Sequence, residues 1–232
     1  MSFEEARLLA ASYLFRDVDA VTVDRIATLA VTRRFDTGDS IFYKGDPGEA
    51  LYGVMSGRVR ISTSAPDGRD MILYVMQPGE IFGEIAMLDD HERTADAYAL
   101  EPTRLMLIRR RDFKPLLRSD PALADYFIRL LCRRFRRVNQ VIEDAAFLPL
   151  SARLAKRLLF LTRNGAESGL GSAAKKLRVS QTELARMLGT SRETVNRALQ
   201  VWHRHGQVAL GRGTIEVIDR EALAREGDGE PA

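Results

Sequence analysis

A stretch of 25 residues, 122–146, contains neither proline nor glycine and constrains the fold more than any other segment. Apolar residues recur along it every three or four positions, namely Phe127, Leu131, Phe135, Val138, Ile142 and Ala145. This spacing predicts one helix about 37 Å long with a narrow apolar stripe. Such a stripe suits packing on the same chain and a seam between two parallel copies about equally. In both cases the helix divides the chain into two parts with different patterns.

The part before this helix predicts an antiparallel roll or barrel. Two segments with helical spacing, 3–14 and 22–32, precede six short β-like runs: Ser40–Tyr43, Ala50–Ser56, Gly57–Thr63, Met71–Met76, Thr94–Ala99 and Arg104–Ile108. Turn-forming residues such as Pro66-Asp67-Gly68 separate the runs. Regularly spaced short strands with such turns are typical of an all-β roll.

The part after the helix predicts a small domain of helices followed by a hairpin. In order, the pattern indicates a helix over 151–163, a Gly/Ser-rich loop over 164–173, helices over 181–188 and 192–204, and a hairpin over 207–218. From residue 226 onward the composition predicts disorder.

The two short helices have the signature of a helix-turn-helix. Ser180 and Glu183 form a capping box that starts the first helix. Gly189 follows that helix where a left-handed residue permits a sharp turn. Ser191 then caps the second helix. An ordinary helix pair without DNA function remains the alternative, but these signals occur together and precede a β-wing.

The second helix carries a polar face suited to reading bases. Val195, Leu199 and Trp202 share its buried side, whereas Arg192, Glu193, Asn196 and Arg197 lie opposite, near its N-terminal end. A recognition helix presents that end to the major groove, where arginine bonds guanine and glutamate accepts from cytosine. Glu193 is therefore expected to read a base, although an ion pair with Arg197 is the alternative. Arg212, in the expected wing, is placed to contact phosphate.

Charge and cysteine content narrow the function classes. The net charge is −3 over residues 1–118 and +8 over 148–225. This difference suggests a polyanionic partner for the C-terminal part, with a solvated basic face as the alternative. Cys132 is the single cysteine, so intrachain disulfides and Cys-rich metal sites are excluded. No apolar run approaches the roughly 18 residues of a membrane span. The N-terminus lacks the features of a signal peptide, and a cytoplasmic, non-membrane protein is expected.

A segment between two expected strands is suited to binding phosphate. Gly83, Glu84, Ile85 and Ala86 predict a short helical turn with free amides, and Arg93, followed by Thr94, can clamp a phosphate. Glu84 cannot favourably face that phosphate and needs a donor such as a ribose hydroxyl. The pair fits a nucleotide monophosphate, although a surface Arg–Glu pair fits the spacing equally well.

Four motifs together resemble the cyclic-AMP receptor protein (CRP/FNR) family over nearly the whole chain. They are FDTGDSIFYKGDPGEALYGVMSGRVRI, GEIFGEIAMLDDHERTADA, AFLPLSARLAKRL and TSRETVNRAL. The resemblance implies an α+β fold: a double-stranded β-helix (jelly-roll) nucleotide-binding domain over 1–118, a dimerisation helix over 119–147, a winged helix-turn-helix over 148–225 and a disordered tail over 226–232. It also implies a homodimeric transcription regulator that binds a palindromic operator under cyclic-nucleotide control.

The resemblance assigns roles to individual residues. Glu84 should bind the ribose 2′-hydroxyl, and Arg93, Thr94 and the turn of Gly83, Ile85 and Ala86 the cyclic phosphate. Ile61 and Leu73 should line the purine. Ser191, Arg192, Glu193, Asn196, Arg197 and Arg212 should contact DNA with a TGTGA-like half-site. The loop 164–172 corresponds to a region that contacts RNA polymerase.

Two departures from the family's sequence pattern leave the identity of the effector open. The segment between Glu84 and Arg93 is about one residue shorter than in the best-known member. Val138 and Asn139 stand where that member has a hydroxyl pair facing the purine. Val138 cannot hydrogen-bond a base, whereas Asn139 can donate and accept. Cyclic AMP is the expected effector, with cyclic GMP or no nucleotide as the alternatives.

Two other function classes are less consistent with the sequence. A cupin-type enzyme needs metal or catalytic ligands, but the only histidines are His91, His203 and His205, and two of these fall in the DNA-binding part. A haem axial role for His91 is less favoured than a surface position. A regulatory module for a protein partner would not need a helix-turn-helix. We therefore expect neither an enzyme nor a metal site.

Overall fold

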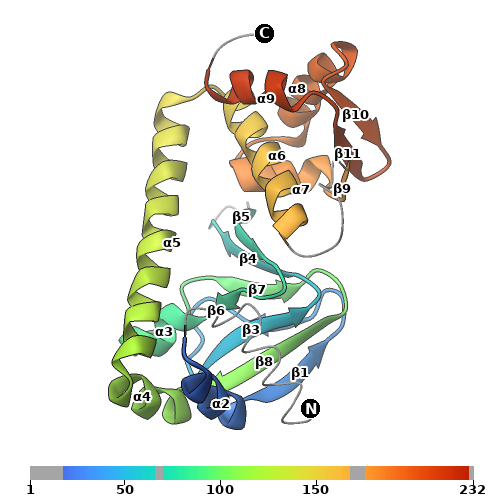
Figure 1. Cartoon of the computed structure of the whole chain (residues 1–232). Helices are drawn as coiled ribbons and strands as arrows, with labels where there is room; N and C mark the ends of the chain where they lie inside the picture. The colour runs from blue at the N-terminus through green and yellow to red at the C-terminus, as the bar shows by residue number, and fades with distance from the viewer. Residues whose placement is uncertain (1–17, 66–69, 168–175, 230–232) are drawn as a thin grey trace. The chain divides into compact units, whose positions relative to one another are not determined.

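A computed structural model describes residues 18–65, 70–167 and 176–229 of the chain (Figure 1). The chain divides into two compact units, Met1–Arg134 and Phe135–Ala232. The expected helix over 3–14 and the turn at Pro66-Asp67-Gly68 lie outside the described residues.

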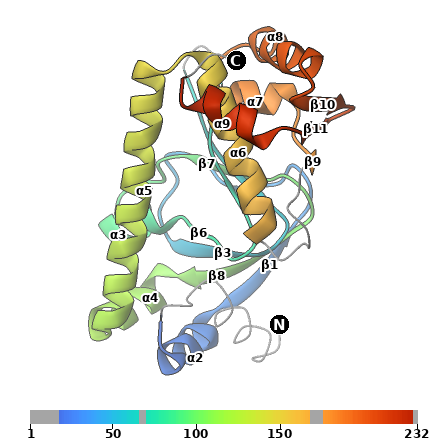
Figure 2. The ribbon, with the colours of Figure 1, turned by 45° about the horizontal axis from the view of Figure 1, so that its top comes forward.

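The first unit is a roll of two four-stranded antiparallel sheets, as the sequence predicted. One sheet has the order β1-β8-β3-β6 (Figure 2). The other has the order β2-β7-β4-β5. The strands of the first sheet are β1 Val31–Phe35, β8 Thr103–Arg109, β3 Ala50–Ser56 and β6 Ile81–Phe82. Those of the second are β2 Ser40–Phe42, β7 Asp96–Ala99, β4 Val59–Ser64 and β5 Asp70–Met76.

Strand β3 is buried on both faces because each face meets a different hydrophobic cluster. Tyr52 and Val54 point into the roll interior with Ile61 of β4. Leu51 and Met55 point outward and pack against helices. Alternation of side chains along a strand produces this division, so one seven-residue strand joins both clusters.

Helices α2 (Ala20–Leu29), α4 (Arg110–Ser119) and the start of α5 cover the outer face of the first sheet. Their buried residues include Ile26, Phe113 and Phe127. The prediction of a helix over 22–32 was wrong at its end, because α2 stops at Leu29 and β1 begins at Val31. In β1 most positions are polar, and its pairing with β8 provides the backbone hydrogen bonds that sequence periodicity does not reveal.

Helix α5 runs from Pro121 to Phe147. Asp120 precedes it and its carboxylate accepts a hydrogen bond from the Leu123 amide, 3.0 Å away, which caps the first turn. Phe127 of the expected apolar stripe is 2% exposed and packs inside the first unit, as the alternative of packing on the same chain allows. Ile128, 59% exposed, takes its place on the outside.

The second unit contains a helix-turn-helix and a three-stranded sheet with the order β10-β11-β9. Its elements are α6 Leu150–Glu167, β9 Lys176–Leu177, α7 Gln181–Leu188, α8 Arg192–Arg204, β10 Val208–Gly211, β11 Thr214–Val217 and α9 Arg220–Gly227. Leu154, Leu199 and Trp202 belong to its single core. Within the described part of the chain, no helix has the length and apolar character needed to cross a membrane.

Two boundaries in this unit differ from the sequence-based expectation. Helix α6 continues through residues 164–167, which were assigned to a loop, and 168–175 lie outside the described residues. Residues 226 and 227 were assigned to the disordered tail but belong to α9. Asp219 caps α9 and Leu223 is fully buried, so core packing holds a helix whose sequence alone has little periodicity.

Candidate nucleotide pocket and DNA-binding surface

Helix α3 (Glu84–Asp89) begins at a glycine that no other residue can replace without strain. Gly83 has φ +78°, in the left-handed region. A Cβ atom at this position would lie 2.7 Å from Nη1 of Arg93. Both the backbone conformation and the close approach of Arg93 therefore require glycine.

Arg93 is the buried cation of this segment. It is 4% exposed, and its guanidinium donates to the carbonyl oxygens of Gly83 (2.7 Å) and Ala50 (2.8 Å). The same group lies 4.3 Å from the ring centroid of Phe42. Burial lowers the pKa of Arg93, and the nearby Tyr52 and Glu84 oppose this effect. Among the described residues its Nε has no hydrogen-bond partner.

Glu84 is buried and paired with a residue that the sequence analysis did not identify. Its carboxylate is 1% exposed and forms an ion pair with Arg134 of α5. Arg134 also donates to the carbonyl of Ile81, while Oε2 of Glu84 has no partner among the described residues. A buried carboxylate needs a cation, but only the fold shows which arginine of α5 supplies it.

The remaining predicted nucleotide residues lie in several environments. Ala86 is buried against Gly48, where an added Cβ would clash at 2.5 Å, whereas Ile85 and Thr94 are exposed. Ile61 is part of the roll interior, and Leu73 packs against it. Val138 and Asn139 are exposed on α5 and belong to the second unit.

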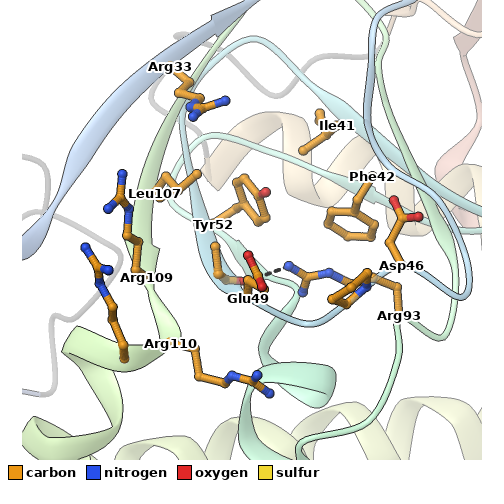
Figure 3. A pocket seen from close by; sticks show the side chains of 13 residues that line it. Arg33, Ile41, Phe42, Asp46, Glu49, Tyr52, Arg93, Leu107, Arg109 and Arg110 are labelled. Carbon is orange, nitrogen blue, oxygen red and sulfur yellow. Dashed lines mark hydrogen bonds between the residues drawn. The ribbon is translucent and has the colours of Figure 1, made fainter.

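A cavity of about 680 Å³ lies in the first unit beside Arg93 (Figure 3). Its volume is within the range of small-molecule sites. Its lining residues are Arg33, Ile41, Phe42, Asp46, Pro47, Glu49, Ala50, Tyr52, Arg93, Leu107, Arg109, Arg110 and Arg111. Of the predicted nucleotide residues, it includes Arg93 alone. No sequence pattern pointed to the others, because they come from strands β1, β2, β3 and β8, the loop before β3 and the start of α4.

The helix-turn-helix forms as its capping residues predicted. Ser180 accepts from the Glu183 amide at 3.1 Å, and the Glu183 carboxylate accepts from the Ser180 amide at 2.8 Å. Gly189 has φ +63° and ends α7, and Ser191 caps α8 through the Thr194 amide at 3.2 Å. These local hydrogen bonds set where both helices begin and end.

The outer face of α8 is polar and exposed near its N-terminus. Arg192, Glu193 and Arg197 are exposed, and Asn196 is half-buried beside them. The pKa of Glu193 is lowered by a hydrogen bond from its own amide, then by Ser191, with Arg192 and Arg197 adding to the effect. Arg197 donates to the Thr194 hydroxyl at 3.4 Å. Glu193 is thus held as an anion among cations.

Arg212 lies where a wing should present a cation. It is exposed in the turn between β10 and β11, and Gly211 pairs with Thr214 across that turn. The hairpin follows directly after α8, so Arg212 and the α8 surface belong to one compact unit.

Two family models match the two parts of the chain. A model described as the cyclic nucleotide-binding domain matches residues 32–120, and one described as the Crp-like helix-turn-helix domain matches residues 152–226. The first match covers the roll with Arg93 and Glu84, and the second covers α7, α8 and the wing.

Known proteins match the chain over nearly its whole length. The chain is 38% identical over 218 residues to the "Cyclic AMP receptor protein" of Thermus thermophilus, covering 94% of this chain and 97% of that protein. It is 33% identical over 219 residues to the "CRP-like cAMP-activated global transcriptional regulator" of Mycobacterium tuberculosis, with the same coverages. The crystal structure of the Thermus thermophilus catabolite activator protein matches with a TM-score of 0.53 and 37% identity, covering 94% of this chain and 99% of that one.

Proposed function

Because the chain belongs to the CRP/FNR family of transcription regulators, which are not enzymes, we propose that it binds operator DNA under control of a cyclic nucleotide, with cyclic AMP as the effector. One observation carries the proposal: the buried Arg93 and Glu84 beside the glycine turn of α3 and the capped second helix of a helix-turn-helix occur in the same chain.

The cyclic phosphate binds at Arg93, with the backbone of Gly83, Ile85 and Ala86 and the hydroxyl of Thr94 as further donors. Arg93 is positively charged and buried, and its guanidinium donates to the neutral carbonyl oxygens of Gly83 and Ala50, so an incoming phosphate gains a desolvated charge-assisted pair. This is the strongest single interaction that the site offers.

The sugar and base occupy the neighbouring positions. Oε2 of Glu84, which has no hydrogen-bond partner among the described residues, accepts from the ribose 2′-hydroxyl. Ile61 and Leu73 contribute apolar contact to the purine, and Asn139 of α5 hydrogen-bonds its edge next to Val138. The cyclic AMP named in the relatives' descriptions matches this set of donors and acceptors.

The protein acts as a homodimer through α5. Exposed apolar residues repeat at seven-residue spacing along the helix, as Ile128, Phe135 and Ile142, and Val138 lies between them. Their exposed fractions are 59%, 67%, 61% and 42%. A repeat of seven is the period of a parallel coiled coil, which buries such residues against a second copy.

DNA is read by α8 from each copy. Arg192 and Arg197 bond guanine, and Glu193 accepts a hydrogen bond from cytosine. The phosphate backbone of the DNA is contacted by the remaining residues, Ser191, Asn196 and Arg212. Two such helices in a symmetric dimer bind a palindrome with TGTGA-like half-sites. A regulator of this kind works in the cytoplasm, where RNA polymerase is its further partner.

Nucleotide control follows from differential binding. A ligand shifts a two-state dimer only if it binds one state more tightly. Arg93, Glu84 and Asn139 together contact the cyclic nucleotide, and Asn139 lies on α5. A different arrangement of α5 therefore alters the affinity for the nucleotide. By reciprocity the ligand then changes the population of the DNA-binding state.

The test is operator binding measured by gel shift with and without cyclic AMP, on wild-type protein and on the Arg93→Ala variant. We expect cyclic AMP to tighten binding of wild type and to leave Arg93→Ala unaffected, with circular dichroism showing that the variant is folded. Cyclic GMP in a parallel series identifies the alternative effector. DNA binding that is equal under all conditions would remove nucleotide control from the proposal.

A further inference from the structure

The cavity beside Arg93 has more positive charge than a cyclic nucleotide requires. Five arginines and two carboxylates line it. A cyclic monophosphate carries one negative charge, and Arg93 alone can neutralise it. The excess comes from Arg33, Arg109, Arg110 and Arg111, which play no part in the function proposed above.

Two of these arginines have no carboxylate partner among the described residues. Arg110 pairs with Asp90 at 2.9 Å, and Arg111 lies 3.7 Å from Asp112. Arg33 and Arg109 have no such ion pair in the described part of the chain. The five guanidinium groups outnumber the two carboxylates of Asp46 and Glu49 in the lining, so a ligand anion would relieve the repulsion among them.

The sheet register brings these two residues to the cavity. Arg109 of β8 lies directly opposite Ala50 of β3, whose carbonyl accepts from Arg93. Arg33 of β1 lies opposite Leu105 of β8. Figure 3 shows Arg33, Arg109 and Arg93 around the same cavity as Tyr52.

The rest of the lining defines the ligand's chemistry. Ile41, Phe42, Pro47 and Leu107 give the cavity an apolar part. Burial raises the pKa of Tyr52, so its hydroxyl stays a neutral donor. The carboxylate of Asp46 already accepts from the Tyr43 amide at 2.8 Å. The cavity therefore combines an apolar wall with guanidinium groups that match phosphate bidentately.

We propose that this cavity binds an organic phosphate with at least two negative charges, held by Arg33 and Arg109 in front of Arg93. The ligand class is a nucleotide or sugar ester with two or more phosphate charges, whose organic part rests on Ile41 and Leu107. Arg93 is shared with the cyclic-nucleotide site, whereas Arg33 and Arg109 belong to this cavity alone.

Isothermal titration calorimetry of the full chain tests the proposal, with ATP, inorganic pyrophosphate and adenosine as probes. We expect ATP and pyrophosphate to bind and adenosine, which has no phosphate, to give no heat. The double variant Arg33→Ala/Arg109→Ala should lose about tenfold or more in ATP affinity, because each guanidinium makes a charge-assisted bond.

The control removes the same charge from other exposed positions, Arg34 on β1 and Arg118 on α4. Arg34→Ala/Arg118→Ala should keep the wild-type affinity for ATP. Absence of ATP and pyrophosphate binding at millimolar concentration, or an equal loss in both double variants, would overturn the proposal. The proposal would also be overturned if cyclic AMP abolished ATP binding while the Arg33→Ala/Arg109→Ala variant bound ATP as wild type does.

A cyclic AMP titration of the same proteins separates this inference from the proposed function. Arg33→Ala/Arg109→Ala should bind cyclic AMP as wild type does. Wild type that binds ATP but not cyclic AMP would remove only the cyclic-AMP assignment. Wild type that binds cyclic AMP but neither ATP nor pyrophosphate would remove only the second ligand.

Discussion

The guanidinium of Arg134 on α5 pairs with the buried carboxylate of Glu84 in the first turn of α3. Glu84 is 1% exposed and Arg134 is 22% exposed, so the pair is largely removed from water. The two residues are 50 positions apart in the chain. This pair fixes one oxygen of the carboxylate, and the other oxygen has no hydrogen-bond partner among the described residues.

Replacing Arg134 with alanine should destabilise the protein. The variant leaves the Glu84 carboxylate buried without its cation, which costs about 2–3 kcal/mol of unfolding free energy at this partial exposure. Adding Glu84→Gln should recover part of the loss, because the neutral amide needs no cation. Urea denaturation of both single variants and of the double variant measures the coupling free energy between Arg134 and Glu84. Strictly additive effects of the two substitutions would show that the ion pair does not contribute to stability.

Glu84 should account for recognition of the ribose. In wild type, 2′-deoxy cyclic AMP should bind about tenfold or more weakly than cyclic AMP, since a hydrogen bond to a charged acceptor is lost. In Glu84→Ala the two nucleotides should bind alike. Competition titrations measure both ratios. A ratio that stays the same in the variant would place the 2′-hydroxyl elsewhere.

Replacing Glu193 with alanine should relax specificity at one base pair of each half-site. Loss of a cytosine contact removes about 1–3 kcal/mol of discrimination there, while overall binding changes little. Sequencing of operators selected from a randomised pool reports the change. Gln200→Ala, two turns further along the exposed side of α8, is the control and should select the wild-type site.

Replacing Phe135 with glutamate should separate the dimer. The side chain is 67% exposed in the single chain and lies in the seven-residue repeat of α5, so a charge there would be buried at the seam. Sedimentation equilibrium measures the change. Arg133→Gln alters the net charge equally on the opposite side of the helix and should stay dimeric. A dimeric Phe135→Glu variant would place the interface elsewhere.

Asp120 should stabilise the start of α5 in a pH-dependent way. Its pKa is lowered by the Thr22 hydroxyl and then by the Leu123 amide. A group with a lowered pKa in the folded state stabilises fully above its unfolded pKa, about 3.9, and loses this contribution as the pH falls through the folded pKa. Asp120→Ala should therefore cost about 0.5–2 kcal/mol at neutral pH.

Urea titrations of wild type, Asp120→Ala and Asp120→Asn at a series of pH values test this expectation. The cost of Asp120→Ala should shrink as the solution becomes strongly acidic. Asp120→Asn keeps a capping oxygen and should show a smaller cost. A cost that is constant with pH would show that the carboxylate's charge contributes nothing.

Elements determined by short-range interactions could be predicted from the sequence. The bounds of α7 and α8 followed from Ser180, Glu183, Gly189 and Ser191, because each cap is a hydrogen bond between residues three or four positions apart. The roll could be predicted from its regularly spaced turns. Strand β1 could not be predicted, because its hydrogen bonds go to β8, some seventy residues later in the chain.

The same distinction applies to the site. The sequence alone identified Arg93 and Glu84 as a charged pair of residues beside a glycine turn, and α5 as one long helix with an apolar stripe. The tertiary structure decided that Arg134 neutralises Glu84, that Phe127 is core while Ile128 faces outward, and that Arg33 and Arg109 join Arg93 around one cavity. Local hydrogen bonds and periodicity are written into neighbouring residues, whereas burial and charge pairing depend on which distant strand or helix lies opposite.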